Sequence, residues 1–210
     1  MLFRSGLFGG GSGYRFRMTV EVDTPQGLKS GSSVYEVIAY KSVALTSEEK
    51  PGGGGLRGQA NVVDLPGGAL FVLLKMPVAG EGLGEAATFA MRPETPRGNV
   101  TDYVAAVHAL GRWGDGAKAE LPRRDWPMMV RFGDVGDPTS VAEIDPETVG
   151  VRRILVETTT DSVTGGIEKR LSWLNTHVGT LVKRPRDMPI GQMTKTQRLT
   201  VLDFRKGATE

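Results

Sequence analysis

The sequence contains no cysteine, so disulfide bonds, thiolate metal ligands and cysteine nucleophiles are all excluded. It has two histidines, His108 and His177, and neither has a second metal-ligating residue three or four positions away. This spacing is not that of a zinc site, and we expect neither histidine to be functional. No apolar run approaches the roughly 18–20 residues that a membrane-spanning helix needs.

Several nucleotide-binding and hydrolase motifs are also missing. The chain has no phosphate-binding loop motif, no glycine fingerprint joining a strand to a helix, and no Gly-x-Ser-x-Gly elbow. We therefore expect no cofactor and no bound metal, and a protein that is not an enzyme is favoured over one that is. The formal net charge of +2 gives no reason for the whole molecule to bind a polyanion.

Glycine and proline are abundant, with 29 and 12 residues among 210. They occur in clusters, which is typical of turns and loops between short strands. The sequence therefore predicts an α+β fold of mainly antiparallel β-sheet, built of hairpins, with one or two helices packed on it.

Two hairpins are indicated by the pattern of apolar residues. Residues 14–22 alternate strictly between apolar and polar, so they predict a strand with one buried side, paired through the turn at 23–27 with a strand at 32–40. Residues 59–65 and 69–75 flank a Pro-Gly-Gly turn. The second of these strands is apolar on both sides and is therefore expected in the middle of a sheet. The four glycines at 52–55 are expected to form an exposed loop.

The remaining elements are less regular. A helix is expected from Asn99 or Thr101 to about Trp113, and a shorter one at 166–174. Further strands are expected at 126–132 and 151–160, and an edge strand at 197–204. The predicted organisation is a flexible tether at 1–13, a single domain at 14–182 and a basic C-terminal tail at 183–210.

An acidic stretch is the most enzyme-like feature of the sequence. Its candidate catalytic residues are Asp134, Asp137, Asp145 and Glu147, with Glu143 between them. Paired carboxylates can act as general acid and base or bind a hard cation. However, Asp-Pro pairs are ordinary at turns and helix starts, so a structural role is favoured.

Basic residues gather near the C-terminus, and the candidate anion-binding residues are Lys183, Arg184, Arg186 and Arg198. Such a segment could contact nucleic acid or anionic lipid. Only Trp173 and Phe204 are available to stack on bases, so a solvated tail is favoured over a nucleic-acid site.

The N-terminus allows two interpretations. Residues 1–8 are mostly apolar and are followed by the glycine-rich stretch 9–13, which has the composition of a flexible linker. They are either a disordered tail or the remnant of an apolar anchor or signal segment, shortened by a late start.

Several stretches resemble an uncharacterised family of proteobacterial proteins that often begin with a signal, lipoprotein or membrane-anchor segment. The resemblance is carried by YRFRMTVEVDTPQG at 14–27, SGSSV at 30–34, GQANVVDL at 58–65, LFVLL at 70–74, PTSV at 138–141 and TGGIEK at 164–169. It covers roughly residues 14–75 and 126–174. It implies a location in the bacterial envelope or periplasm, with the cytoplasm as the alternative, and it implies no activity and no catalytic residues. This chain departs from the lipoprotein members because it has no cysteine to which a lipid could be attached.

The favoured hypothesis is a non-enzymatic bacterial envelope module that binds a protein or cell-wall partner through its sheet or loops. Contact with a membrane would occur only through a truncated N-terminal anchor. One alternative is a carboxylate-dependent hydrolase or metal-binding enzyme that uses the 134–147 loop. The other is a nucleic-acid-binding protein that uses the basic C-terminal segment.

Overall fold

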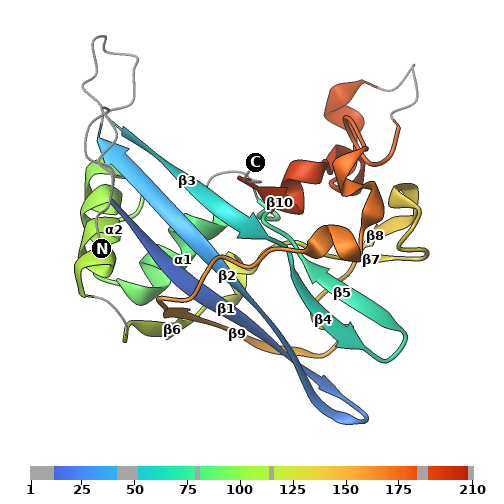
Figure 1. Cartoon of the computed structure of the whole chain (residues 1–210), viewed down its shortest axis with the longest axis horizontal. Helices are drawn as coiled ribbons and strands as arrows, with labels where there is room; N and C mark the ends of the chain where they lie inside the picture. Colours follow the sequence, from blue (N-terminus) through green and yellow to red (C-terminus); the bar gives the residue numbers. More distant parts are fainter. Residues whose placement is uncertain (1–11, 42–51, 79–80, 114–115, 184–188, 208–210) are drawn as a thin grey trace.

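The structure, a computed structural model, describes residues 12–41, 52–78, 81–113, 116–183 and 189–207. Their strands form one six-stranded and one four-stranded sheet, and every strand pair is antiparallel (Figure 1). Two helices pack against the six-stranded sheet. The expected α+β class with mainly antiparallel sheet is confirmed.

The six-stranded sheet has the order β10-β3-β2-β1-β9-β6, and the four-stranded sheet has the order β4-β5-β7-β8. The strands of the larger sheet are β1 (Ser12–Thr24), β2 (Gly27–Lys41), β3 (Gly52–Gln59), β6 (Lys118–Glu120), β9 (Val151–Thr158) and β10 (Arg205–Lys206). Those of the smaller sheet are β4 (Asn61–Leu65), β5 (Gly68–Val72), β7 (Met129–Phe132) and β8 (Val141–Glu143). The helices are α1 (Leu83–Met91) and α2 (Val100–Trp113).

Both predicted hairpins are confirmed. Strands β1 and β2 pair from Thr24 and Gly27 outward, and the left-handed φ of +98° at Gly27 closes the turn. Along β1, buried and partly exposed residues alternate as the sequence indicates. Strands β4 and β5 pair around the Pro-Gly turn in the same way.

Strand β5 explains why a continuous apolar run is needed in the smaller sheet. Leu70 and Val72 face the core shared with the larger sheet, whereas Phe71 and Leu73 face a second core. Strand β5 lies between β4 and β7, so its predicted central position is confirmed. The second core is closed by residues from the C-terminal part of the chain, among them Leu199 and Phe204, which are fully buried.

The two sheets are joined by a direct crossing of the chain. Strand β3 ends at Gln59 and β4 begins at Asn61, so the chain passes from one sheet to the other at Ala60. The Asn61 side-chain amide donates to the backbone carbonyls of Met18 at 3.0 Å and Gly31 at 3.1 Å. These bonds hold the start of β4 against strands β1 and β2.

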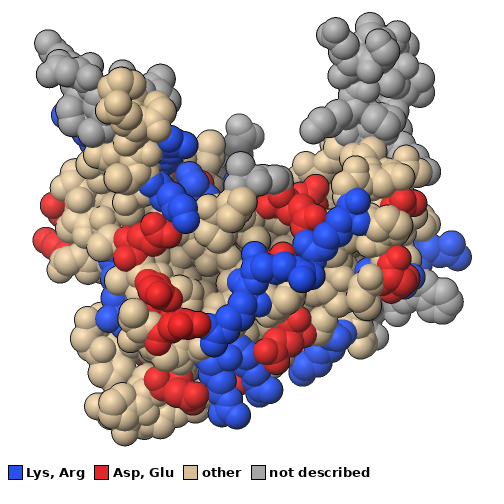
Figure 2. Space-filling view, turned by 180° about the vertical axis from the view of Figure 1, so that it is seen from behind, with Lys and Arg blue, Asp and Glu red and all other residues tan. Residues whose placement is uncertain are grey.

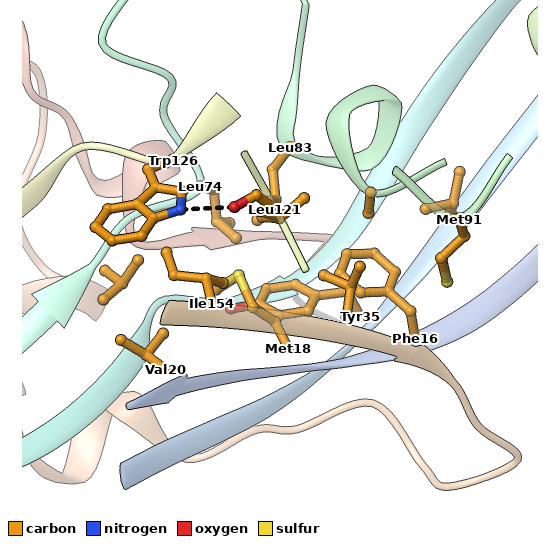
Figure 3. Packing of buried hydrophobic residues seen from close by; sticks show 14 of the residues in the cluster. Phe16, Met18, Val20, Tyr35, Leu74, Leu83, Met91, Leu121, Trp126 and Ile154 are labelled. Atoms are coloured by element: carbon orange, nitrogen blue, oxygen red, sulfur yellow. Dashed lines mark hydrogen bonds between the residues drawn. The ribbon is translucent and has the colours of Figure 1, made fainter. Parts of the chain in front are cut away.

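The main core lies between the larger sheet and both helices, and strands β4, β5 and β7 also contribute residues to it; Figure 3 shows part of this core. Phe16 and Tyr35 stack with their ring centroids 5.1 Å apart. Trp126 lies at the edge of this core, where its indole N–H donates to the Leu121 carbonyl at 2.9 Å. The buried polar end of the indole is therefore satisfied.

The glycine stretch at 52–55 is not a loop, contrary to expectation. It forms the first half of β3 and pairs with residues 38–41 of β2. Glycine has no side chain, so the alternation of apolar and polar residues that predicts a strand is missing here. The segment is extended because it pairs with the long strand β2.

Two further expectations are corrected, and one helix was not expected. The segment expected to form a helix at 166–174 forms two 3₁₀ turns, Ile167–Lys169 and Ser172–Asn175. Their apolar residues are buried in the second core, although their spacing is not that of an α-helix. The edge strand expected at 197–204 is replaced by 3₁₀ turns, and β10 follows it. Helix α1 was not expected, because it is buried on most sides and shows no amphipathic period.

The face of the larger sheet away from the helices carries rows of paired charges. Glu36 on β2 accepts from Arg57 on β3 at 2.9 Å and from Arg15 on β1 at 3.4 Å. On the face of the molecule shown in Figure 2, Lys and Arg side chains form a diagonal band with Asp and Glu on both sides. Neither sign of charge therefore dominates that face.

Candidate functional site

The acidic candidates belong to two separate parts of the 133–150 segment. Asp145 and Glu147 line a cleft of about 360 Å³ together with Glu143, Arg123 and Trp126, whereas Asp134 and Asp137 do not line it. The Glu147 carboxylate is paired with Arg123, whose guanidinium also lies 4.9 Å from the centre of the Trp126 ring. The structure thus brings two of the four candidates to one cleft.

Three of these carboxylates are used to hold their own turns. Asp134 accepts from the Gly136 amide at 2.8 Å, Asp137 from the Thr139 amide at 2.8 Å, and Asp145 from the Glu147 amide at 2.9 Å. The bonds from Thr139 lower the pKa of Asp137, which is the opposite of what a general acid needs. Within the described ranges, no three Asp, Glu or His side chains are grouped so that they could hold a metal ion.

The basic candidates are only partly visible. Arg184 and Arg186 lie outside the described residues. Lys183 is exposed, and the Arg198 guanidinium donates to the Gly191 carbonyl at 3.2 Å. A bridge between Thr180 and Thr200 brings their two segments together.

Both histidines make local contacts. His108 is hydrogen-bonded to the Ser12 hydroxyl, and His177 contacts the Thr180 carbonyl at 3.0 Å and the Trp173 ring edge.

A feature that the sequence did not reveal is the exposed edge of β3. Strand β10 covers only Gly58 and Gln59 of this strand. Along residues 52–57, no strand in the described part of the chain pairs with the side of β3 that faces away from β2. Alternate residues of an antiparallel strand direct both their N–H and C=O groups to one side, so, as far as the described residues go, this edge presents backbone donors and acceptors without a strand partner.

A groove of about 350 Å³ runs beside this edge. One wall is the backbone of β3, and the other is the start of α1. The lining residues are Gly54, Gly55, Leu56, Leu74, Gly82, Leu83, Gly84, Glu85, Tyr103 and Lys206. The groove therefore combines an exposed strand edge with apolar side chains.

Two glycines allow close packing around the groove. A Cβ at Gly54 would lie 3.1 Å from the Tyr103 ring, and one at Gly84 would lie 3.2 Å from Val37. The absence of side chains lets α1 pack close to the sheet and leaves the β3 backbone accessible. At Gly55 a Cβ would meet no atom within 4 Å, so this residue faces open space.

Three polar side chains lie around the groove. Burial raises the pKa of the Tyr103 phenol, so this group remains protonated. The Glu85 carboxylate accepts from the Gly82 amide at 2.7 Å, which fixes the first turn of α1. Lys206 brings a positive charge to the β10 side of the groove. Among the described residues that line the groove, no nucleophile is paired with a base.

The groove is formed by the glycine stretch 52–55 and by helix α1, and the sequence did not indicate that these two segments lie side by side. The four consecutive glycines were visible but indicated a loop, and α1 was hidden by its uniform burial. Comparisons with protein-family models, with characterised proteins and with solved structures found no match to this chain. The candidate site therefore rests on its geometry.

Proposed function

We propose that this protein is a non-enzymatic binding module that takes up an extended segment of a partner protein as an additional strand along β3. The observation that carries the proposal is the position of the exposed β3 edge, at residues 52–57, beside the groove formed with α1. Addition of a strand to a sheet edge derives affinity from backbone hydrogen bonds and specificity from pockets for alternate side chains.

The dimensions suit a short peptide. Six residues of edge correspond to about 20 Å of strand, the length of an ordinary β-strand. Every second side chain of the bound segment would point toward the groove, where Leu56 is partly exposed and the buried Leu74 and Leu83 line the base. We therefore propose a partner segment with small or medium apolar residues at alternate positions.

The composition of the edge also supports this function. Proteins usually protect an exposed edge with lysine, proline, a bulge or a very short strand. Residues 52–56 carry neither charge nor proline. Exposed backbone groups match a polypeptide better than a glycan, so a protein partner is favoured over a cell-wall polymer.

The proposed location is the bacterial envelope, and it rests on the family resemblance. None of the helices in the described ranges is both long enough and apolar enough to cross a membrane. Cell fractionation, with mass mapping of the mature N-terminus, tests the location. Recovery from the envelope supports it, and a cytosolic protein that starts at Met1 contradicts it without affecting the groove.

Peptide selection tests the binding function. The full chain is used to select peptides from a random displayed library, and hydrogen–deuterium exchange is measured with and without a selected peptide. We expect slower exchange at amides of residues 52–57, because edge donors become hydrogen-bonded. N-methylation of alternate peptide amides should abolish binding, since it removes backbone donors while keeping the side chains.

A pair of matched variants makes the test specific. Gly55→Lys adds a charged side chain to the edge, and Gly191→Lys adds the same side chain elsewhere. At both glycines a Cβ meets no atom within 4 Å and φ is not left-handed, so both variants should fold. We expect Gly55→Lys to weaken binding at least about tenfold and Gly191→Lys to leave it unchanged. Equal binding by both variants, or unchanged exchange at 52–57, would contradict the proposal.

A further inference from the structure

A second cavity lies on the other side of the β3 terminus, where three distant segments of the chain meet. The end of β3 at 57–59, the loop at 163–166 and the β10 segment at 205–207 enclose a volume of about 230 Å³, with Glu168 beside them. Figure 1 shows the end of β3 and β10 together near the middle of the molecule. Most of this cavity is distinct from the groove, although Lys206 contributes to both.

Positive charge exceeds negative charge around this cavity. Arg57, Arg205 and Lys206 line it, against the single carboxylate of Glu168. The Arg205–Glu168 contact is long, at 3.4 Å. Among the described residues, Lys206 has no ion-pair partner.

The nearest carboxylate outside the cavity does not remove this excess. Glu36 pairs with Arg57 at 2.9 Å, but it also pairs with Arg15 at 3.4 Å. One carboxylate is thus shared between two guanidinium groups. A guanidinium has five N–H donors, so Arg57 retains donors for another acceptor.

The backbone forms the opposite wall. Gly165 and Gly166 lie between two anchored residues, because the Thr164 amide donates to the Val34 carbonyl at 3.1 Å and the Ile167 amide donates to the Gln59 side chain at 2.9 Å. A Cβ at Gly165 would meet no atom within 4 Å. Gly166 has a φ of +98°, a conformation that favours glycine. This part of the wall therefore consists of the backbone of Gly165 and Gly166, and hydrogen bonds of Thr164 and Ile167 hold it on both sides.

The position of Arg57 is fixed by another glycine. A Cβ at Gly207 would lie 2.7 Å from Cγ of Arg57, so the chain after β10 packs directly on the stem of this side chain. Gly207 has a φ of +65°. The stem of the Arg57 side chain is thus placed by the packing of the chain after β10.

We propose that this cavity binds a small ligand through an oxyanion, either a phosphoryl or a carboxylate group. Arginine and lysine make charge-assisted hydrogen bonds to both groups, and the space accommodates one such group with a few further atoms. A nucleic acid would need a continuous positive surface, whereas Glu36 and Glu168 interrupt this one.

The probes are inorganic phosphate and acetate, each titrated into the full chain at constant ionic strength and followed by backbone amide NMR. We expect saturable shifts at Gly165 and Gly166. A response to phosphate alone identifies a phosphoryl ligand, a response to acetate alone identifies a carboxylate, and a response to both supports the shared chemistry. The absence of saturable shifts with either probe overturns the proposal, whatever the variants do.

Three substitutions test the residues involved. Arg57→Gln and Lys206→Met should each weaken binding of the responding probe about tenfold, because each removes a charged donor. Lys29→Met on the exposed β1–β2 hairpin is the matched control and should leave binding unchanged. Equal affinity in all three variants would show adventitious ion binding and overturn the proposal. Arg205 lines this cavity but neither the peptide groove nor the 52–57 edge, so loss of anion binding in Arg205→Gln with intact peptide binding separates the two sites.

Discussion

The phenol oxygen of Tyr14 lies 2.9 Å from the Thr88 hydroxyl oxygen, and this buried contact ties strand β1 to helix α1. The Thr88 hydroxyl donates to the Gly84 carbonyl at 2.7 Å, so its single proton is already used and Tyr14 must be the donor. Because the start of α1 forms one wall of the groove, this pair helps to set the distance between that wall and β3.

Thr88→Val should destabilise the protein more than Tyr14→Phe. Valine leaves the buried Tyr14 hydroxyl without an acceptor, at a cost of about 1–3 kcal/mol, whereas phenylalanine removes the donor itself, at a cost of about 0.5–1.5 kcal/mol. The free energy of unfolding from urea denaturation measures both. The double variant should lose less than the sum of the single losses, because the two residues share one bond. Strictly additive losses would show that the hydroxyls do not interact.

Gly31→Ala should separate the two sheets where they cross. A Cβ at Gly31 would lie 2.1 Å from the Val62 carbonyl oxygen and 2.7 Å from the Asn61 side chain, so β2 and β4 must move apart. We expect a loss of about 1–3 kcal/mol or more in the free energy of unfolding. Gly55→Ala is the control, since no atom lies within 4 Å of its Cβ, and it should change stability little. An alanine tolerated equally well at both positions would contradict the close crossing.

Stability should fall in alkaline solution. Burial raises the pKa of Tyr14, Tyr35 and Tyr103 above the ordinary value of 10.0. Above pH 10 the unfolded chain loses these protons while the folded protein keeps them, so the free energy of unfolding decreases as the pH rises. The contribution is complete below pH 10 and is lost as the pH rises toward the raised values. Each tyrosine adds up to about 1.4 kcal/mol per pH unit to the slope.

Urea denaturation at successive pH values measures this slope, and tyrosinate absorbance reports ionisation. Tyr35→Phe should reduce the slope by the share of one tyrosine. The chain has four tyrosines, and Tyr40 is exposed. Ionisation of more than one tyrosine before structure is lost would show that the buried phenols are accessible.

Side-chain patterns predicted the regular elements well. The alternation along β1 and the two-sided apolar run of β5 both corresponded to the burial found in the fold. Asn99 also caps α2 as expected, with its side-chain oxygen accepting from the Thr101 amide at 2.9 Å. In each case the pattern is local, since adjacent side chains report which side of the element is buried.

The candidate sites were beyond such patterns. Glycine at 52–55 favours a loop by composition, and it becomes a strand only because β2 supplies a backbone partner. The acidic candidates were predicted because paired carboxylates can act in catalysis or bind a cation. In the structure, Asp134, Asp137 and Asp145 accept hydrogen bonds from amides of their own turns. Arg57, Gly165 and Lys206 are far apart in the sequence, and no spacing relates them.

The sequence by itself determined the α+β class, the two hairpins and the exclusion of cysteine chemistry, because propensity, alternation and composition act over neighbouring residues. Only the tertiary structure decided that β3 has an exposed edge beside α1 and that three segments enclose a cationic cavity. Both features depend on which strand ends where in the sheet and on how closely glycine lets backbones approach. These are long-range relationships, and they are fixed when the whole core packs.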